Sequence, residues 1–365
     1  MDTRARPPAP ATPSDVIRHV GILGGGSISE THARAVAAVP DLRVAAVCGR
    51  NAGRVEALAA QHGAVAFTDR DAFLRHRPMD IVAIGTPSGV HGDDIEAAAA
   101  QGLHVLCEKP LDVTTARIDR LLAAVERAGV ALGVFFQDRS SPDLMDVKDA
   151  LVSGRLGRPI LADARVKWYR PPEYYAQSGW RGTWALDGGG ALMNQGVHTV
   201  DLLLWLLGDV RRVYARTLAA LHAIEVEDTA VAVLEFESGA VATLEATTAA
   251  WPGYDRRVSI TGTLGTIVIE QARVVKWDVR EPALVGAPGG AAAIAPNAPA
   301  GAAASTHVVA DASPHRRVFE DFVSALDTGR PPRVDGREGR RSVALIEAIY
   351  ASSRTGQPVD VARPA

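Results

Sequence analysis

The sequence has few cysteines and little net charge. Of its 365 residues only 2 are cysteines, Cys48 and Cys107. Both lie in apolar segments, which indicates small core side chains in a reducing compartment rather than a disulfide framework. A formal net charge of -3 gives no field that would favour nucleic acid or an anionic membrane surface. We therefore expect a protein with no nucleic-acid or membrane partner.

Long apolar runs are also missing. No stretch reaches the roughly 20 apolar residues that a membrane helix needs. Residues 1–16 contain two arginines, but no apolar segment follows them, so this Pro- and Ala-rich stretch predicts a disordered tail rather than a signal peptide. A cytoplasmic protein is the expectation that remains.

Residues 17–137 alternate short apolar strands with Ala-rich amphipathic segments. Strands are expected at 18–24, 42–49, 80–87, 104–108 and 131–136, and helices at 29–39, 52–63, 91–102 and 114–129. Strands that are apolar throughout and separated by helices are typical of a parallel sheet covered on both faces. The pattern predicts a doubly wound α/β domain that binds a dinucleotide.

Residues 138–365 show a different pattern. Strand-like alternation runs through 160–170, 210–219, 228–249 and 256–270, and helices are expected at 142–154, 193–208, 315–329 and 336–356. The Ala/Gly/Pro-rich stretch at about 282–305 predicts a loop or a disordered insert. We expect an α+β substrate-binding domain with an open, mostly antiparallel sheet. An open apolar sheet face would remain exposed in a monomer, so a homodimer or homotetramer is expected.

A glycine-rich turn follows the first predicted strand. Gly24 and Gly26 fit the first two glycines of a dinucleotide-binding turn, while Ser29 stands in place of the third. A glycine-rich turn of this kind can also be a simple tight loop without a ligand. Its place between a strand and a helix favours binding of a pyrophosphate to the backbone around Gly24, Gly26, Ser27 and Ile28.

The end of the second strand lacks a carboxylate. Where an NAD site usually has Asp or Glu, this chain has Arg50 and no acidic residue between Leu42 and Val55. An arginine can pair with the 2′-phosphate of NADP, although Arg50 could also be a solvated turn residue. We expect NAD(P), with NADP slightly favoured over NAD.

Charged and polar residues follow two further strands. Glu108-Lys109 comes directly after one strand, and the segment Thr86 to His91 follows the strand before it. Ligands of parallel sheets bind beyond the carboxyl ends of the strands. Lys109 could therefore donate to a substrate oxygen there, and a solvated surface pair is the alternative.

Four stretches together resemble the glucose–fructose oxidoreductase/inositol dehydrogenase/MocA (Gfo/Idh/MocA) family. They are GILGGGSISETHARAV, TPSGVH, GLHVLCEKP and DGGGALMNQGVHTVDLLLWLLG. The resemblance implies an N-terminal Rossmann domain and a C-terminal domain with an open antiparallel sheet. It implies that Lys109 is the catalytic lysine, that Pro110 is cis, and that Thr86, Pro87 and His91 line the cofactor site, with Glu108 and Lys109 beside them.

Asn194, His198 and Asp201 have the spacing i, i+4, i+7, which predicts one helical face. His198 suits a general base because the usual histidine pKa is about 6.5. The resemblance gives it that role, or one in orienting the substrate. Asn194 is often aspartate in the family, and an amide can only form hydrogen bonds. We expect Asp201 to orient the His198 ring or to bind substrate.

An aromatic and basic segment, residues 167–184, precedes this helix in a chain that is 5% aromatic. Aromatic faces stack on sugars and arginines bind oxyanions, so Tyr169 and Arg181 are predicted to contact substrate. Gln137 and Arg139 follow the last strand of the first domain and are predicted to lie near the same cleft. The segment could equally be an oligomer contact. No Cys/His cluster has the spacing of metal ligands, so no metal is expected.

These features predict hydride transfer between a nicotinamide and a secondary alcohol of a sugar, cyclitol or sugar derivative. Lys109 would bind the reacting oxygen and His198 would take its proton. Two alternatives stay open, an NAD-dependent glycosidase of the same family and a non-catalytic sugar-sensing regulator. The presence of Lys109 and His198 argues against the regulator.

Overall fold

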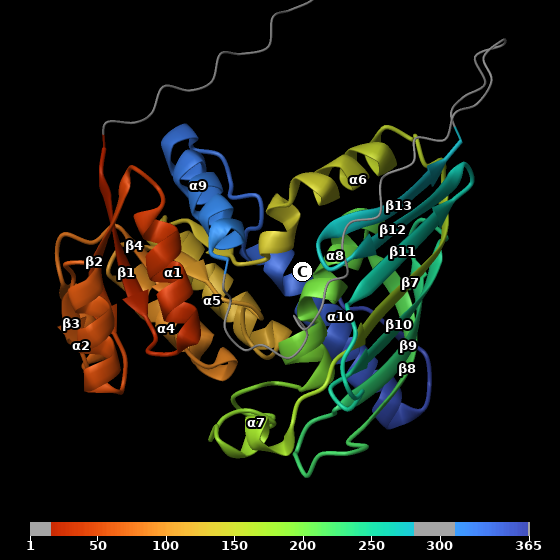
Figure 1. Cartoon of the computed structure of the whole chain (residues 1–365), viewed down its shortest axis with the longest axis horizontal. Coiled ribbons are helices and arrows are strands. Elements are labelled where there is room, and N and C mark those ends of the chain that lie inside the picture. Colours follow the sequence, from red (N-terminus) through yellow and green to blue (C-terminus); the bar gives the residue numbers. More distant parts are fainter. Residues whose placement is uncertain (1–15, 281–310, 364–365) are drawn as a thin grey trace, which may run out of the picture.

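The computed structural model describes residues 16–280 and 311–363. The predictions for the tail and for the insert at about 282–305 thus concern residues outside the described part, apart from residue 16. Two layered units lie side by side, and helices α8 (Val197–Leu207) and α10 (Gly336–Thr355) lie between the first unit, drawn in red to orange, and the larger sheet of the second (Figure 1). Within the described part no helix combines the length and hydropathy that crossing a membrane would need.

The first unit is a six-stranded sheet in which every neighbouring pair is parallel. Its order is β3-β2-β1-β4-β5-β6, which is the doubly wound order that reverses direction beside β1. The strands are β1 (Arg18–Leu23), β2 (Leu42–Cys48), β3 (Val65–Phe67), β4 (Ile81–Ile84), β5 (His104–Cys107) and β6 (Leu132–Val134). The connecting helices are α1 (Ser27–Ala37), α2 (Ala52–Gln61), α3 (Arg70–Arg75), α4 (His91–Ala100) and α5 (Thr115–Ala128).

The central strands are apolar because both faces of this sheet are covered. Ile81 to Ile84 of β4 are all buried, as are the last three residues of β5. Strand β3 and helix α3 were not predicted from the sequence. The strand is only three residues long and partly exposed, so it lacks the apolar run that identified its neighbours.

The second unit is an eight-stranded sheet of order β13-β12-β11-β7-β10-β9-β8-β14. Neighbours are antiparallel except β7 and β10, which pair in parallel. The strands are β7 (Pro159–Lys167), β8 (Val210–Leu218), β9 (Thr229–Phe236), β10 (Val241–Thr247), β11 (Arg257–Gly262), β12 (Gly265–Glu270), β13 (Arg273–Val279) and β14 (Val359–Asp360). The predicted fold class is confirmed.

One face of the large sheet is covered by helices, and on the other face apolar side chains are exposed. The covering elements include α6 (Pro142–Val152), the π-helix η3 (Ala191–Gly196), α8 (Val197–Leu207) and α10 (Gly336–Thr355). Strand β9 alternates buried and exposed positions, and Val231 and Val233 are each about half exposed (51% and 48%). A short helix, α7 (Pro172–Ala176), lies at the foot of this unit in the view of Figure 1.

The helix α9 (Ser313–Thr328) crosses back to the first unit. It packs on α1 (Figure 1). Its residues Phe319 and Phe322 share a core cluster with Val20 and Ile22 of β1. The sequence had assigned this helix to the second domain because it follows that domain in the chain. In space, α9 covers the first unit, and its residue His315 lines a cleft at the carboxyl ends of that unit's strands.

Candidate active site

A cleft of about 1190 Å³ opens at the carboxyl ends of β1, β2, β4 and β5. Its volume exceeds the roughly 300–1,000 Å³ of a pocket for a single small ligand, which leaves room for a dinucleotide and a second molecule. One wall comes from the first unit and the other from residues 168–198 of the second. The lining includes these residues predicted from the sequence: Gly24, Gly26, Ser27, Ile28, Arg50, Thr86, Pro87, His91, Glu108, Lys109, Gln137, Arg181, Asn194 and His198.

The glycine turn leaves backbone exposed where α1 begins. Gly24 has φ +137, and a Cβ there would lie 2.7 Å from the carbonyl oxygen of Gly85. A Cβ on Gly26 would meet nothing within 4 Å, so the turn is open on that side. Gly26 is the N-cap residue of α1, and no side chain caps the helix. The first N–H groups of α1 are thus available for an anion, as a pyrophosphate requires.

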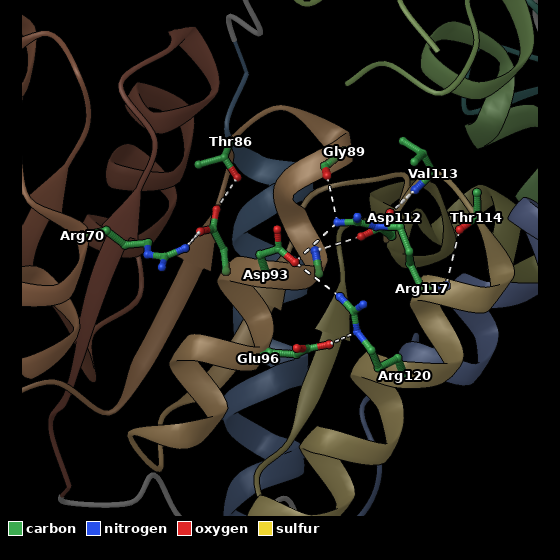
Figure 2. A network of polar contacts seen from close by, with 12 residues as sticks. Arg70, Thr86, Gly89, Asp93, Glu96, Asp112, Val113, Thr114, Arg117 and Arg120 are labelled. Carbon is green, nitrogen blue, oxygen red and sulfur yellow. Dashed lines mark hydrogen bonds and ion pairs between the residues drawn. The ribbon is translucent and has the colours of Figure 1, made fainter. Parts of the chain in front are cut away.

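Arginines dominate the cleft at the end of β2. Arg50 and Arg54 both line it, and Asn51 caps α2 by accepting a hydrogen bond from the Arg54 N–H at 3.0 Å. Among the described lining residues the only carboxylates are Asp94 and Glu108. Asp94 accepts hydrogen bonds from Arg70 at 3.1 Å and Thr86 at 2.8 Å (Figure 2). Neither Arg50 nor Arg54 takes part in an ion pair within the described ranges.

The segment after β4 is fixed by hydrogen bonds to the segment after β5. His91 is buried, and its ring nitrogens bond to the carbonyl oxygens of Pro110 at 2.8 Å and Thr86 at 2.9 Å. Arg117 of α5 bonds to Asp112 at 2.8 Å and to the Gly89 carbonyl at 2.9 Å (Figure 2). These bonds hold the two strand-end loops together as one rigid edge of the cleft.

Glu108 lies between two histidines that come from distant parts of the chain. His32 Nε2 of α1 lies 2.9 Å and His315 Nε2 of α9 lies 3.5 Å from Glu108 Oε1. Burial alone would raise the pKa of Glu108, but the histidine hydrogen bonds hold it well below the usual value. Burial lowers the pKa of His32. The three groups are close enough to share one cation. We interpret them as hydrogen-bonded support for an ionised Glu108, because both imidazoles direct Nε2 to the carboxylate.

Lys109 crosses the cleft. Its ammonium group donates a hydrogen bond of 2.9 Å to the carbonyl oxygen of Asn194 in η3. Burial lowers the pKa of Lys109, while the carboxylates of Glu108 and Asp187 act against that shift. The Lys109–Pro110 peptide bond is cis, as the resemblance implied. A positive charge from the first unit is thus positioned against the second.

His198 faces the same part of the cleft from α8. Burial lowers its pKa well below 6.5, and the positive charge of Lys109 lowers it further, so the imidazole is neutral near pH 7. Its ring packs at right angles to Phe136, and Nδ1 has no hydrogen-bond partner among the described residues. A neutral imidazole can accept a proton.

Asn194 is held by a residue that was not among the predicted site residues. Its amide donates a short hydrogen bond to Asp187, which also accepts one of 2.8 Å from the Gly182 N–H. Burial raises the pKa of Asp187 to about 6, although these two hydrogen bonds oppose the shift. Asp187 opens the DGGG stretch, and its position just before the glycines was the one available signal.

Three predicted substrate contacts are not brought to the cleft. Arg139 and Asp201 form a buried pair with bonds of 2.6 and 2.9 Å, and neither lines the cleft. Asp201 therefore does not orient His198. It lies one turn farther along α8, about 4.5 Å below His198 at 1.5 Å per residue. Tyr169 pairs with Ala249 and packs its ring on Trp251, outside the lining.

Other residues of the aromatic and basic segment form a wall of the cleft. The residues are Trp168, Arg170, Tyr174, Gln177, Ser178, Gly179, Trp180 and Arg181. Arg170 donates to the Gln195 side chain at 2.8 Å, and Gln195 in turn donates to the Asn194 side chain at 3.0 Å. The wall is therefore linked by hydrogen bonds to the residue that Lys109 contacts.

A parallel doubly wound sheet that carries an open glycine turn and a lysine, joined to a domain that brings a histidine to the same cleft, defines a dinucleotide-dependent oxidoreductase. Residues 18–136 match the oxidoreductase family with an NAD-binding Rossmann fold, and residues 144–268 match the GFO/IDH/MocA C-terminal domain. The chain belongs to the Gfo/Idh/MocA family, whose members here include NAD(P)-dependent dehydrogenases.

Similar proteins differ in what their names say they act on. D-xylose 1-dehydrogenase (NADP(+)) 2 of Haloferax volcanii is 30% identical over 93% of this chain and 99% of its own length. Inositol 2-dehydrogenase of Rhizobium meliloti is 27% identical over 94% of this chain and 98% of its own. The WlbA dehydrogenase from Bordetella pertussis, solved in complex with NADH and UDP-GlcNAcA, is 33% identical with a TM-score of 0.83, covering 96% of this chain and 100% of that one.

Proposed function

We propose that this protein oxidises a secondary alcohol of a sugar, a cyclitol or a sugar derivative and transfers the hydride to NAD(P). One observation carries the proposal. Lys109 from the first unit and His198 from the second line the same cleft as the open glycine turn. A lysine and a neutral imidazole are the groups needed to bind an alcohol oxygen and remove its proton.

The residues present fit a dinucleotide. The backbone from Gly24 to Ile28 would hold the pyrophosphate, since the uncapped N-terminus of α1 favours negative charge. Thr86, Pro87 and His91 would line the middle of the cofactor site, and Glu108 would lie at its nicotinamide end. The nicotinamide, when bound, supplies the hydride acceptor. The protein supplies position and charge.

In the proposed reaction Lys109 donates a hydrogen bond to the alcohol oxygen and stabilises the negative charge that develops on it. His198 takes the hydroxyl proton, which its neutral state permits. Asn194, fixed by Asp187, holds a neighbouring hydroxyl. Gln137 lines the cleft and is proposed as a further substrate contact. Arg139, Asp201 and Tyr169 are left out of this set because they lie away from the cleft.

The preference for NADP over NAD stays part of the proposal. It is supported by Arg50 and Arg54 at the end of β2, where no carboxylate in the described lining would bind the ribose hydroxyls. A homodimer or homotetramer assembled through the exposed face of the large sheet also stays a proposal, supported by exposed Val231 and Val233.

The test is a scan of the purified protein with NAD and NADP against a panel of sugars, cyclitols and sugar derivatives. The proposal expects net reduction of the cofactor with at least one of them. Release of free sugar without net cofactor turnover would favour the NAD-dependent glycosidase instead. Absence of both, with sugar binding retained, would favour the regulator.

A further inference from the structure

Positive charge gathers at two places along the cleft. The described lining contains the basic residues Arg50, Arg54, Arg70, Lys109, Arg170 and Arg181, against the acidic residues Asp94 and Glu108. Asp94 is paired with Arg70, and Glu108 is held by two histidines. Arg50 and Arg54 are accounted for by the proposed cofactor. The second group, Lys109, Arg170 and Arg181, lies at the substrate end, beyond the part of the cleft that the proposed dinucleotide would fill.

Arg181 is the basic residue of this group whose charge is least balanced by the described part of the chain. Its guanidinium lies over the ring of Tyr174, 4.2 Å from the centroid, and 5.4 Å from the centroid of Trp180. The one hydrogen bond that the guanidinium donates to a described residue goes to the Tyr174 carbonyl at 3.4 Å, and its Nε is buried without a partner in the described part of the chain. No carboxylate there lies within ion-pair distance of it. A buried donor of this kind costs free energy unless something accepts its hydrogen bond.

The residues beside Arg181 are joined by hydrogen bonds. Arg170 is 7% exposed and donates from Nε and Nη2 to the Gln195 side-chain oxygen at 3.2 and 2.8 Å. Gln195 also donates to the Tyr174 hydroxyl at 2.9 Å. The guanidinium of Arg170 is thereby fixed in direction, and it lies over the Trp168 ring. The nearest carboxylate in this network, Asp187, accepts from Gly182 and Asn194 and does not line the cleft.

We propose that Arg181 and Arg170, with Tyr174 and Trp180, bind an anionic group of the substrate, so that the substrate is an acidic sugar. This rests on the proposed function. A planar guanidinium matches a carboxylate or a phosphate oxygen pair, whereas a neutral sugar offers hydroxyls that leave the charge unbalanced. The chain of hydrogen bonds from Arg170 through Gln195 to Asn194 places this anion site beside the reacting end of the cleft. The anion is a carboxylate on the sugar or a phosphate attached to it.

The experiment measures binding by calorimetry to the full-length protein saturated with NADPH, which occupies the arginines at the end of β2. Probes are D-glucuronate, glucose 1-phosphate, UDP-glucose and UDP-glucuronate, with glucose and myo-inositol as neutral references. We expect at least one anionic probe to bind tenfold or more tightly than both neutral sugars. A carboxylate source is indicated by glucuronate, and a phosphate source by glucose 1-phosphate or UDP-glucose.

The variant Arg181→Gln should weaken binding of that probe by about tenfold or more, since a hydrogen bond to a charged group contributes about 1.5–3 kcal/mol. Binding of the neutral sugars should not change. The matched control is Arg273→Gln, an exposed arginine on β13.

Equal or tighter binding of neutral sugars, no binding of any anionic probe, or an Arg181→Gln variant with unchanged affinity would each overturn the proposal. Cofactor reduction with neutral sugars alone would leave the proposed function standing, and anion binding without any cofactor reduction would refute the function but not the site.

Discussion

Lys109 Nζ donates a 2.9 Å hydrogen bond to the carbonyl oxygen of Asn194, and these residues come from different domains. The lysine is carried on the segment that leaves β5, and the carbonyl belongs to the π-helix before α8. A positive charge is thus held across the cleft within one turn of His198.

The buried Arg139–Asp201 pair is expected to support stability rather than substrate binding. Asp201→Asn would leave Arg139 without its main counter-charge, and breaking a buried pair costs about 3–5 kcal/mol. Urea unfolding should therefore show a clearly lower midpoint for Asp201→Asn, with the KM for substrate unchanged. Arg120→Ala, which removes an exposed pair with Glu96, should leave the midpoint unaltered. Normal stability of Asp201→Asn together with a raised KM for substrate would show that Asp201 contacts the substrate.

Arg50 should decide between the two dinucleotides. Arg50→Ala is expected to raise the KM for NADP by about 10- to 100-fold, because a hydrogen bond to a charged group is worth about 1.5–3 kcal/mol. The KM for NAD should change little, because NAD has no 2′-phosphate. Arg75→Ala, at an exposed position on α3 outside the cleft lining, is the control. An equal rise in the KM for NADP and for NAD would show that Arg50 does not bind the 2′-phosphate.

The exposed face of the large sheet should hold the subunits together. Light scattering is expected to give a dimer or tetramer for the wild-type protein. Replacing both Val231 and Val233 by lysine should produce a monomer with an unchanged unfolding midpoint, because these side chains project from the outer face of β9. Val152→Lys, an exposed valine at the end of α6, should not alter assembly. A monomeric wild-type protein would contradict the prediction.

The pH dependence of kcat/KM should reflect a low pKa for His198 and for Lys109. Activity needs neutral His198, whose pKa lies well below 6.5, so it should persist as the pH falls through 6.5 and decline only at lower pH. Activity also needs charged Lys109, whose pKa is below 10.5, so the alkaline decline should begin under that value. His198→Gln should lower kcat by about 10²–10⁴ and remove the acid limb.

The acid limb of the pH dependence of kcat/KM could instead come from Asp187. Its pKa is raised to about 6. An acid limb near pH 6 that survives in His198→Gln and disappears in Asp187→Asn would assign the proton to Asp187. That result would exclude His198 as the base.

Most of the fold followed from hydrophobic patterning. Strands such as β4 and β5 are apolar throughout because both faces of their sheet are buried, so their runs stood out. Strands of the large sheet alternate buried and exposed residues because one face of the sheet is open, and the sequence of β9 shows this alternation. The pattern could not place α9, since an amphipathic helix shows which face is buried but not which domain it covers.

The candidate site was predicted where its residues directly follow predicted strands. The strand-end rule brought Gly24, Thr86 and Lys109 to one edge because parallel strands share a direction. The helix-face rule did not anticipate that Asp201 would pair with buried Arg139 and lie outside the cleft lining, because no local signal joins these two residues. His315 lies 207 residues from Glu108 in the chain, and no local signal joins them.

The most direct test of the account is the rate of hydride transfer in a single turnover of Lys109→Met. We expect a loss of about 10²–10³ in this rate relative to the wild-type protein, as for removal of one donor to a developing negative charge. Cofactor binding should be retained, and Lys276→Met, at an exposed position on β13, should behave as wild type. Hydride transfer at the wild-type rate in Lys109→Met would contradict the central claim that this ammonium group holds the reacting oxygen.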